Sequence, residues 1–243
     1  MSGSADGRRR LLLVEGDRGT ALRGLVQQLI DLPDGALLWV ADEAPDGVVA
    51  VHPRDLGRRL GEECRVLVFD AHRGFHPDAF AAAVGMLRGG GDCVVLTPLH
   101  WSTFRDPDQA RLLAYPRDPA EALDGFLTRI CRLWADSEGV TRVVAGATVP
   151  VRTAPPPGRR VVLTADQQEA AERIRRVALG HARRPLVLTA DRGRGKSTVL
   201  GVTSAELLLG GARRILVVAA HRRAASTLFL HAARASPGAA PEE

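Results

Sequence analysis

The most constraining feature of the chain is a glycine-rich loop between an apolar run and a helix-forming run. The loop, residues 190–198, has the sequence Ala-Asp-Arg-Gly-Arg-Gly-Lys-Ser-Thr. The run before it, residues 185–189, predicts a buried parallel strand, and residues 197–209 carry apolar side chains at helical spacing. Strand, glycine loop and helix in this order place unpaired main-chain amides at a helix N-terminus, which favours an anion.

The loop also holds the only lysine among 33 Lys and Arg residues, Lys196. A compact ammonium fits between phosphate oxygens, whereas a planar guanidinium prefers side-on, bidentate contacts. The spacing is that of a phosphate-binding loop, in which Lys196 neutralises the terminal phosphates and Ser197 binds Mg²⁺. We therefore predict a site for a nucleoside polyphosphate here.

One position departs from the pattern G-x-x-x-x-G-K-[ST], because Ala190 stands where the first glycine is expected. Alanine costs little there if its φ is negative, and Gly193 and Gly195 remain for the tighter part of the loop. The alternative is an ordinary glycine-rich turn before a helix. The strand-like and helix-like flanks favour the phosphate loop.

A second element lies upstream, where residues 163–170 begin a helix with Thr164 as N-cap and Gln167 at the capping-box position. Capping explains this segment by itself; ahead of a phosphate loop, the Gln167 amide is also predicted to bind the adenine edge. The chain has no Asn, so the Asn-Lys-x-Asp element that grips guanine is absent and ATP is favoured. The predicted ATP-binding residues are Gln167, Arg192, Gly193, Arg194, Gly195, Lys196, Ser197 and Thr198, with Ser197 as the Mg²⁺ ligand.

The fold class predicted from the pattern is α/β. Before residue 150, apolar strand-like runs at 11–14, 37–40, 66–69 and 93–96 alternate with helix-like stretches at 20–30, 77–88 and 119–134, which indicates a layered domain with a largely parallel sheet. A Pro- and Arg-rich linker is predicted at 151–160. Residues 161–243 then form the start of a nucleotide-binding domain, with a further strand at 214–219, a helix opening at 220, and an apparent truncation.

Residues 69–75, at the expected carboxyl end of a strand, contain Asp70, His72 and Arg73, which could serve acid–base or phosphate chemistry. The favoured alternative is structural: Asp70 and His72 satisfy loop amides and Phe75 packs beneath the next helix. The loop at 15–19 likewise resembles a strand-to-helix phosphate turn, but it has no lysine.

The composition of the chain bears on its binding partners, its cysteine chemistry and its location in the cell. The net charge of +5 arises from paired arginines, which suit a polyanion such as RNA, although replacement of Lys by Arg across a chain rich in Ala and Gly equally indicates compositional bias. The three cysteines lack C-x-x-C spacing and predict reduced thiols, and no metal cluster is evident. No apolar run reaches the length of a membrane span, so we predict a cytoplasmic protein.

The whole pattern resembles the bacterial tRNA(Met) cytidine acetyltransferases. The resemblance is carried by residues 9–14, 68–75 with the Ala-rich helix that follows, 163–170 and, above all, 189–197. It implies an N-terminal α/β domain, a RecD-like helicase ATPase module, a GNAT acetyltransferase domain and an RNA-binding tail. Such proteins acetylate N4 of the wobble cytidine in elongator tRNA(Met), using acetyl-CoA and ATP hydrolysis.

The resemblance also implies that the acidic Mg²⁺ motif, the acetyl-CoA site and the tail lie beyond residue 243 of a family protein. We therefore expect this chain to bind ATP weakly and not to acetylate RNA by itself. It would be a fragment, a truncated product or one piece of a split protein whose acetyltransferase domain is a separate chain. Two alternatives are a free-standing helicase-like ATP-binding protein and a non-enzymatic interaction module with a vestigial phosphate loop.

Overall fold

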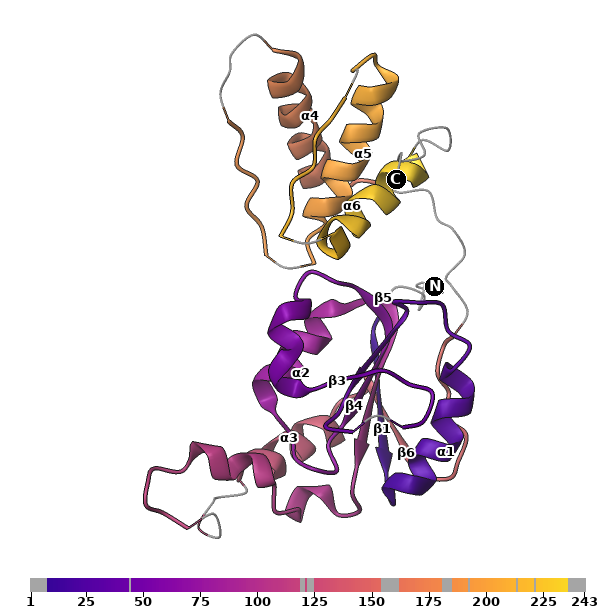
Figure 1. The fold of residues 1–243 in the computed structure, drawn as a ribbon, viewed down its shortest axis with the longest axis vertical. Coiled ribbons are helices and arrows are strands. Elements are labelled where there is room, and N and C mark those ends of the chain that lie inside the picture. Colours follow the sequence, from indigo (N-terminus) through magenta and orange to yellow (C-terminus); the bar gives the residue numbers. More distant parts are fainter. Residues whose placement is uncertain are drawn as a thin grey trace. The chain divides into compact units, whose positions relative to one another are not determined.

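The chain folds into two compact units, residues 1–156 (unit 1) and 157–243 (unit 2), which are described separately (Figure 1). The computed structural model describes residues 8–43, 45–118, 121, 125–153, 162–180, 185–191, 193–212, 214–220 and 222–235. Most of the predicted linker, residues 154–160, lies outside this set.

Unit 1 alternates strands with helices. Its elements are β1 (Arg10–Glu15), α1 (Arg18–Leu29), β2 (Leu37–Val40), β3 (Ala50–Val51), η2 (Pro53–Arg59), β4 (Cys64–Asp70), α2 (Pro77–Met86), β5 (Leu87–Thr97), η3 (Trp101–Thr103), η4 (Pro107–Leu112), α3 (Gly125–Ala135) and β6 (Val140–Val144). The strands form one parallel sheet in the order β3-β2-β4-β5-β1-β6. The four predicted strands and the parallel sheet are confirmed.

Some element boundaries in unit 1 differ from the sequence prediction, and two strands were not predicted. α2 ends at Met86, two residues early, because the glycines at 89–91 disfavour a helix and the chain turns directly into β5. α3 begins at Gly125, and most of residues 119–124, the first part of the helix predicted at 119–134, lie outside the described residues. β3 and β6 were not predicted, since β3 has two residues and β6 is a largely exposed strand at the sheet edge.

The core of unit 1 has two layers because successive strand residues point to opposite faces of the sheet. α1 packs on the face that carries Leu12 and Val14. α2 and α3 pack on the other face of the sheet (Figure 1). That face carries Leu13 and a cluster of aromatic rings centred on Phe75. Cys64 and Cys93 are free and buried in this second layer, and burial raises the pKa of Cys64 to about 12.

A buried carboxylate joins β5, β1 and the segment after β6 in unit 1. Asp92 of β5 is fully buried and pairs with the guanidinium groups of Arg10 and Arg152, each at 2.7 Å. The backbone N–H of Arg152 also donates to Asp92, at 2.7 Å. Burial opposes ionisation of Asp92, but the hydrogen bonds from both arginines outweigh it and lower its pKa. The first residues of the predicted linker are thus fixed to the sheet.

Unit 2 contains α4 (Ala165–Leu179), α5 (Lys196–Leu209) and α6 (Arg222–Ala235), with α5 packed against both other helices. The strands predicted at 185–189 and 214–219 are wrong as strands. Both segments are unpaired in the described part of unit 2, where no ladder is formed. They carry the expected apolar residues, but the side chains of Val187, Leu216 and Val218 are 79%, 85% and 84% exposed, because no neighbouring strand covers them.

Candidate nucleotide-binding site

The glycine loop turns through two left-handed residues before α5. Gly193 has φ +80° and Gly195 has φ +82°, a region that side chains rarely adopt. A Cβ on Gly195 would also collide with the side-chain amide of Gln167. Ala190 is not among the described residues with positive φ, so alanine fits the first glycine position without strain.

The N-terminus of α5 has no side-chain cap. Helices α1 and α4 are capped by Asp17 and Thr164, whose side chains accept a backbone N–H, whereas α5 starts from Gly195. The first four N–H groups of a helix have no partner inside it. The amides that the caps satisfy in α1 and α4 therefore remain available at α5, where the helix dipole favours negative charge.

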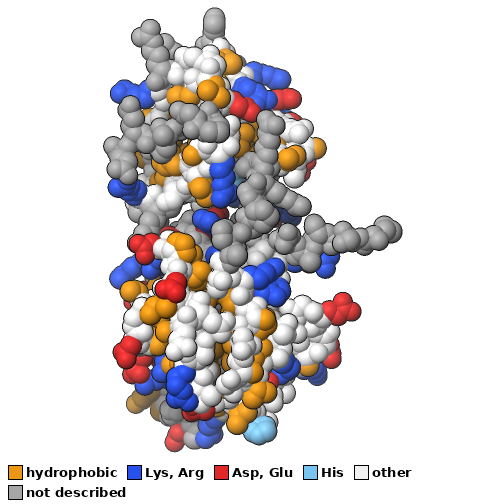
Figure 2. Space-filling view, turned by 90° about the vertical axis from the view of Figure 1, so that its right-hand side faces the viewer, with side chains coloured by type: hydrophobic (Ala, Val, Ile, Leu, Met, Phe, Trp, Pro, Cys, Tyr) orange, Lys and Arg blue, Asp and Glu red, His pale blue; other side chains and the backbone are white. Residues whose placement is uncertain are grey.

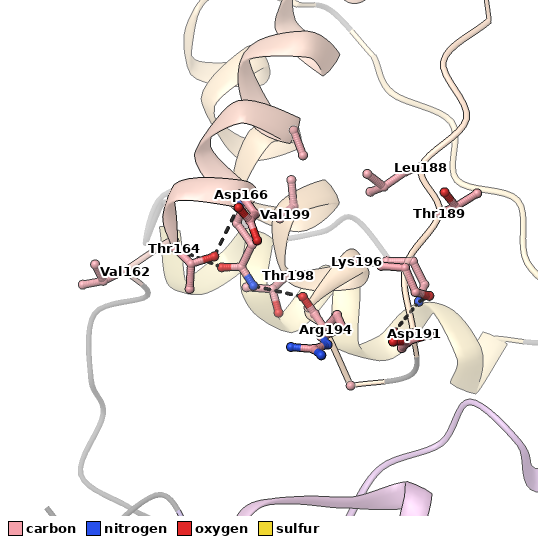
Figure 3. A pocket seen from close by; sticks show the side chains of 15 residues that line it. Val162, Thr164, Asp166, Leu188, Thr189, Asp191, Arg194, Lys196, Thr198 and Val199 are labelled. Carbon is pink, nitrogen blue, oxygen red and sulfur yellow. Dashed lines mark hydrogen bonds between the residues drawn. The ribbon is translucent and has the colours of Figure 1, made fainter.

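Lys196 lies at this N-terminus and folds back over the loop. Its Nζ donates to the carbonyl oxygens of Ala190 at 2.5 Å and Asp191 at 2.9 Å (Figure 3). The ammonium thus stays beside the unpaired amides. A phosphate at the amides would exchange these neutral carbonyl acceptors for charged ones.

Gln167 joins α4 to the loop. Its Oε1 accepts the backbone N–H of Thr164 at 3.1 Å, and together with the Thr164 side chain this completes the predicted capping box. Its Nε2 donates to the carbonyl oxygen of Arg194 at 3.1 Å. Both ends of the amide are thus engaged within the protein, so binding an adenine edge requires that these bonds open.

The loop, α4 and the segment before the loop enclose a pocket of about 950 Å³ (Figure 3). Its lining includes six of the eight predicted residues: Gln167, Gly193, Arg194, Gly195, Lys196 and Thr198. Ser197, the predicted Mg²⁺ ligand, is half-buried on the first turn of α5 and does not line the pocket. Arg192 lies outside the described residues.

Sequence reasoning missed two contributions to this site. Asp166 and Asp191 place carboxylates on the pocket wall, yet nothing in their spacing distinguishes them from ordinary helix-start and loop residues. The Thr198 hydroxyl points away to α6, where its Oγ1 lies 3.1 Å from Nε2 of His231. Among the described residues, no group of three or more His, Cys, Asp and Glu side chains could hold a metal ion.

The other polar cluster lies at the carboxyl ends of β1 and β4 in unit 1. Arg18 donates to Asp70 at 2.6 Å; His72 Nδ1 lies 2.9 Å from Asp70 and Nε2 lies 3.0 Å from the carbonyl oxygen of Gly16. A carboxylate and a carbonyl only accept, so both ring nitrogens of His72 can donate to them only when the ring is protonated. Burial opposes this charge, but the bonds to Asp70 and Gly16 outweigh it and raise the pKa of His72.

This cluster occupies the turn that resembled a phosphate loop. Asp17 caps α1 there by accepting from Thr20, which places a carboxylate at the helix N-terminus where an anion would otherwise bind. Asp70 accepts the backbone N–H of His72, as predicted, whereas His72 itself bonds a carbonyl and not an amide. The arrangement fits the structural alternative for residues 69–75.

The arginine pairs are partly neutralised. Arg58 pairs with Asp55, Arg59 with Glu62 and Arg175 with Glu206. Figure 2 shows Lys and Arg side chains scattered over one face of the molecule and interspersed with acidic and hydrophobic ones. Direct contact of the pairs with RNA stays a prediction.

A parallel α/β unit followed by a glycine loop that opens a helix defines an α/β protein with a partial phosphate-loop module. Two family models match it: the N-terminal domain of tRNA(Met) cytidine acetyltransferase TmcA over residues 1–145, and the helicase domain of RNA cytidine acetyltransferase NAT10/TcmA over residues 187–240. The chain belongs to the tRNA(Met) cytidine acetyltransferase family.

Comparison with individual relatives gives the same family. The chain is 37% identical to the tRNA(Met) cytidine acetyltransferase TmcA of Nitrosococcus halophilus, in an alignment that covers 97% of this chain and 33% of the relative. It is 32% identical to the protein of the same name from Vibrio cholerae and 30% identical to that from Haloferax volcanii, over 90% and 95% of this chain and 27% and 34% of the relatives.

The chain spans about a third of the length of the curated relatives it matches. What those proteins do as wholes therefore enters only as a proposal. Within the part of the chain that the structure describes, none of the helices combines the length and apolar character needed to cross a membrane.

Proposed function

We propose that this chain is the N-terminal portion of an ATP-dependent tRNA acetyltransferase, and that unit 2 binds ATP at the glycine loop. The observation that carries the proposal is the uncapped N-terminus of α5, which sets unpaired amides and the only lysine of the chain beside one pocket. Amides, helix dipole and ammonium all stabilise the same charge, that of a polyphosphate.

Each residue then has a defined task. The amides from Gly193 to Ser197 bind phosphate oxygens, and Lys196 leaves the carbonyls of Ala190 and Asp191 to contact the terminal phosphates. Gln167 exchanges one of its internal hydrogen bonds for the adenine edge. Arg192 and Arg194 belong to the loop sequence and add positive charge.

Ser197 fits the part of a Mg²⁺ ligand by chemistry. Its hydroxyl is a hard oxygen donor on the first turn of α5, and Mg²⁺ needs few protein ligands because it keeps water and phosphate oxygens around it. When bound, Mg²⁺ neutralises charge on the phosphates. Thr198 lines the pocket, but its hydroxyl faces His231, so Ser197 is the better candidate of the two.

For the complete protein we propose N4 acetylation of the wobble cytidine of elongator tRNA(Met) from acetyl-CoA, in the cytoplasm. Family membership supports tRNA as the substrate. Acetyl transfer would be carried out by the part of the relatives that lies outside the matched third, either in the same polypeptide or in a separate chain. Unit 2 would contribute nucleotide binding.

Calorimetric titration of ATP and Mg²⁺ into the whole chain tests the proposal. We expect binding heat and a raised melting temperature for the wild type. Lys196→Ala should weaken binding about 10- to 100-fold, which corresponds to loss of a charged hydrogen bond worth about 1.5–3 kcal/mol. Lys196→Arg should restore little, because a guanidinium does not fit the same place.

The matched control is Arg173→Ala, which removes an exposed ion pair with Glu169 on α4 and should leave ATP binding unchanged. Absence of heat and of any change in melting temperature for the wild type would refute ATP binding. The non-enzymatic alternative, with a vestigial loop, would then be favoured.

A further inference from the structure

Helices α5 and α6 are closely packed against each other. Gly201 lies against the backbone of α6 at Leu228 and Ala232, and a methyl group there would collide with the Leu228 carbonyl. On α5, Val202, Thr203 and Ala205 are buried, and Thr227 of α6 is buried as well. Because packed interiors resist deformation, a displacement of α6 is transmitted to α5.

A polar contact joins the two helices near the glycine loop. Thr198 Oγ1 lies 3.1 Å from Nε2 of His231, and the contact is partly buried. Thr198 is on the first turn of α5, directly after Ser197, and it also lines the pocket. The link therefore acts on the turn whose unpaired amides define the candidate site.

The first turn needs such a link because no side chain caps it. In α4 the capping box of Thr164 and Gln167 fixes the first turn, whereas Gly195 provides no such bond to α5. An uncapped turn frays more readily, and frayed amides do not converge on an anion. His231 restrains this turn from α6 while leaving the amides open.

We propose that His231 is a positioning residue for the nucleotide loop: through Thr198 it holds the first turn of α5 in the orientation that presents the loop amides to phosphate. The proposal rests on the proposed function of the loop. It makes α6 and the pocket energetically coupled, and such coupling is reciprocal, so anything that displaces α6 weakens nucleotide binding and bound nucleotide stiffens α6.

The test compares His231→Ala, Thr198→Val and the double variant in the whole chain by titration with ATP and Mg²⁺. We expect each single variant to bind about fivefold more weakly, the change produced by losing one hydrogen bond worth about 1 kcal/mol. The double variant should be no weaker than either single one, because both remove the same link. His231→Gln, which keeps a polar nitrogen or oxygen in reach, should recover part of the affinity.

Arg175→Ala is the matched control. It removes the ion pair between Arg175 of α4 and Glu206 of α5, so it loosens α5 on its other side without touching Thr198. Its ATP affinity should equal that of the wild type. Additive losses in the double variant, or unchanged binding in Thr198→Val, would overturn the positioning role while leaving ATP binding itself intact.

A measurement without nucleotide separates this inference from the proposed function. In the wild type, hydrogen exchange of the Val199 amide, which donates to the Gly195 carbonyl oxygen across the first turn of α5, should be slower than in His231→Ala and Thr198→Val, and His231→Gln should fall between them. Equal exchange rates in all four proteins would refute the link even if the wild type failed to bind ATP.

Discussion

The two units contain similar apolar segments, which pair into a sheet in unit 1 and remain unpaired in unit 2. In unit 1, β4 lies between β2 and β5, hydrogen-bonds to both, and its Val68 is fully buried. In unit 2, residues 185–191 and 214–220 are as apolar, yet neither pairs with another strand and Val218 remains 84% exposed. An apolar run sets the local preference, but only a neighbouring strand makes it part of a sheet.

The units also differ in how they bury charge. Unit 1 encloses the carboxylate of Asp92 between Arg10 and Arg152, and it holds Asp70 against Arg18 and His72. In the described part of unit 2, the ion pairs on α4 and α5 are exposed or half-exposed, as in the pair of Arg175 with Glu206. Removing one partner of a buried pair should therefore cost unit 1 more than breaking an exposed pair costs unit 2.

The largest expected effect comes from removing the buried carboxylate. Asp92→Asn leaves the guanidinium groups of Arg10 and Arg152 without their shared partner and should lower the free energy of unfolding of unit 1 by about 3–5 kcal/mol. Urea unfolding followed by tryptophan fluorescence measures unit 1 alone, because all three tryptophans, at 39, 101 and 134, lie in it.

The control for this substitution is Glu206→Gln in unit 2, which breaks a half-exposed pair with Arg175. It should leave the tryptophan transition unchanged and alter unit 2 by no more than about 1 kcal/mol. A similar loss from both substitutions would show that the contrast in charge burial does not hold.

A smaller effect is expected when the same substitution is made in a buried strand of unit 1 and in an exposed apolar segment of unit 2. Val68→Thr places a hydroxyl in the fully buried centre of β4 and should cost unit 1 about 1–3 kcal/mol. Val218→Thr replaces an exposed side chain of the same shape and should change the stability of unit 2 by less than about 0.5 kcal/mol. Tryptophan fluorescence follows the first variant, and hydrogen exchange of α5 and α6 follows the second.

If Val218→Thr proves as costly as Val68→Thr, residues 214–220 are covered in solution and the difference between the units disappears. The same variant also tests the exposure of Val218 directly. Exposed apolar side chains bind hydrophobic dyes and promote association, so Val218→Thr should lower dye binding by the folded chain.

These contrasts show what the sequence could predict. Periodicity placed four strands of unit 1, and capping chemistry placed the bonds between Thr164 and Gln167, because both depend on residues close in the chain. The unpaired state of residues 214–219 depends on which strands are neighbours, and a local pattern does not contain that information.

In the candidate site, too, the contiguous features were predicted and the long-range contacts were not. The spacing of Gly193, Gly195 and Lys196 predicted residues that line one pocket, since the loop is contiguous. The bond from Gln167 to the Arg194 carbonyl and that from Thr198 to His231 join residues 27 and 33 positions apart, and no motif marks His231. Long-range polar contacts of this kind require the fold.

The smallest expected effect concerns pH and the imidazolium of unit 1. The folded pKa of His72 is raised, so its contribution to stability is fully present below its unfolded pKa of about 6.5 and is lost as pH rises through the folded value. The pKa of Asp70 is lowered, because the hydrogen bonds from His72 and Arg18 outweigh burial. Its contribution to stability is therefore lost at acid pH, as the pH falls below about 4. Asp17 faces the same cluster from α1 and favours the charged ring.

The difference in unfolding free energy between wild type and His72→Gln should therefore shrink as pH rises from 6 to 9. Tryptophan fluorescence in urea at each pH gives that difference, and ¹⁵N chemical shifts of the His72 ring should show both nitrogens protonated at pH 6. A difference that grows with pH, or a neutral ring at pH 6, would mean that Asp70 or the Gly16 carbonyl is not bonded as the distances indicate. The cluster would then lack the His72 charge, and its ion pair would be that of Arg18 with Asp70 alone.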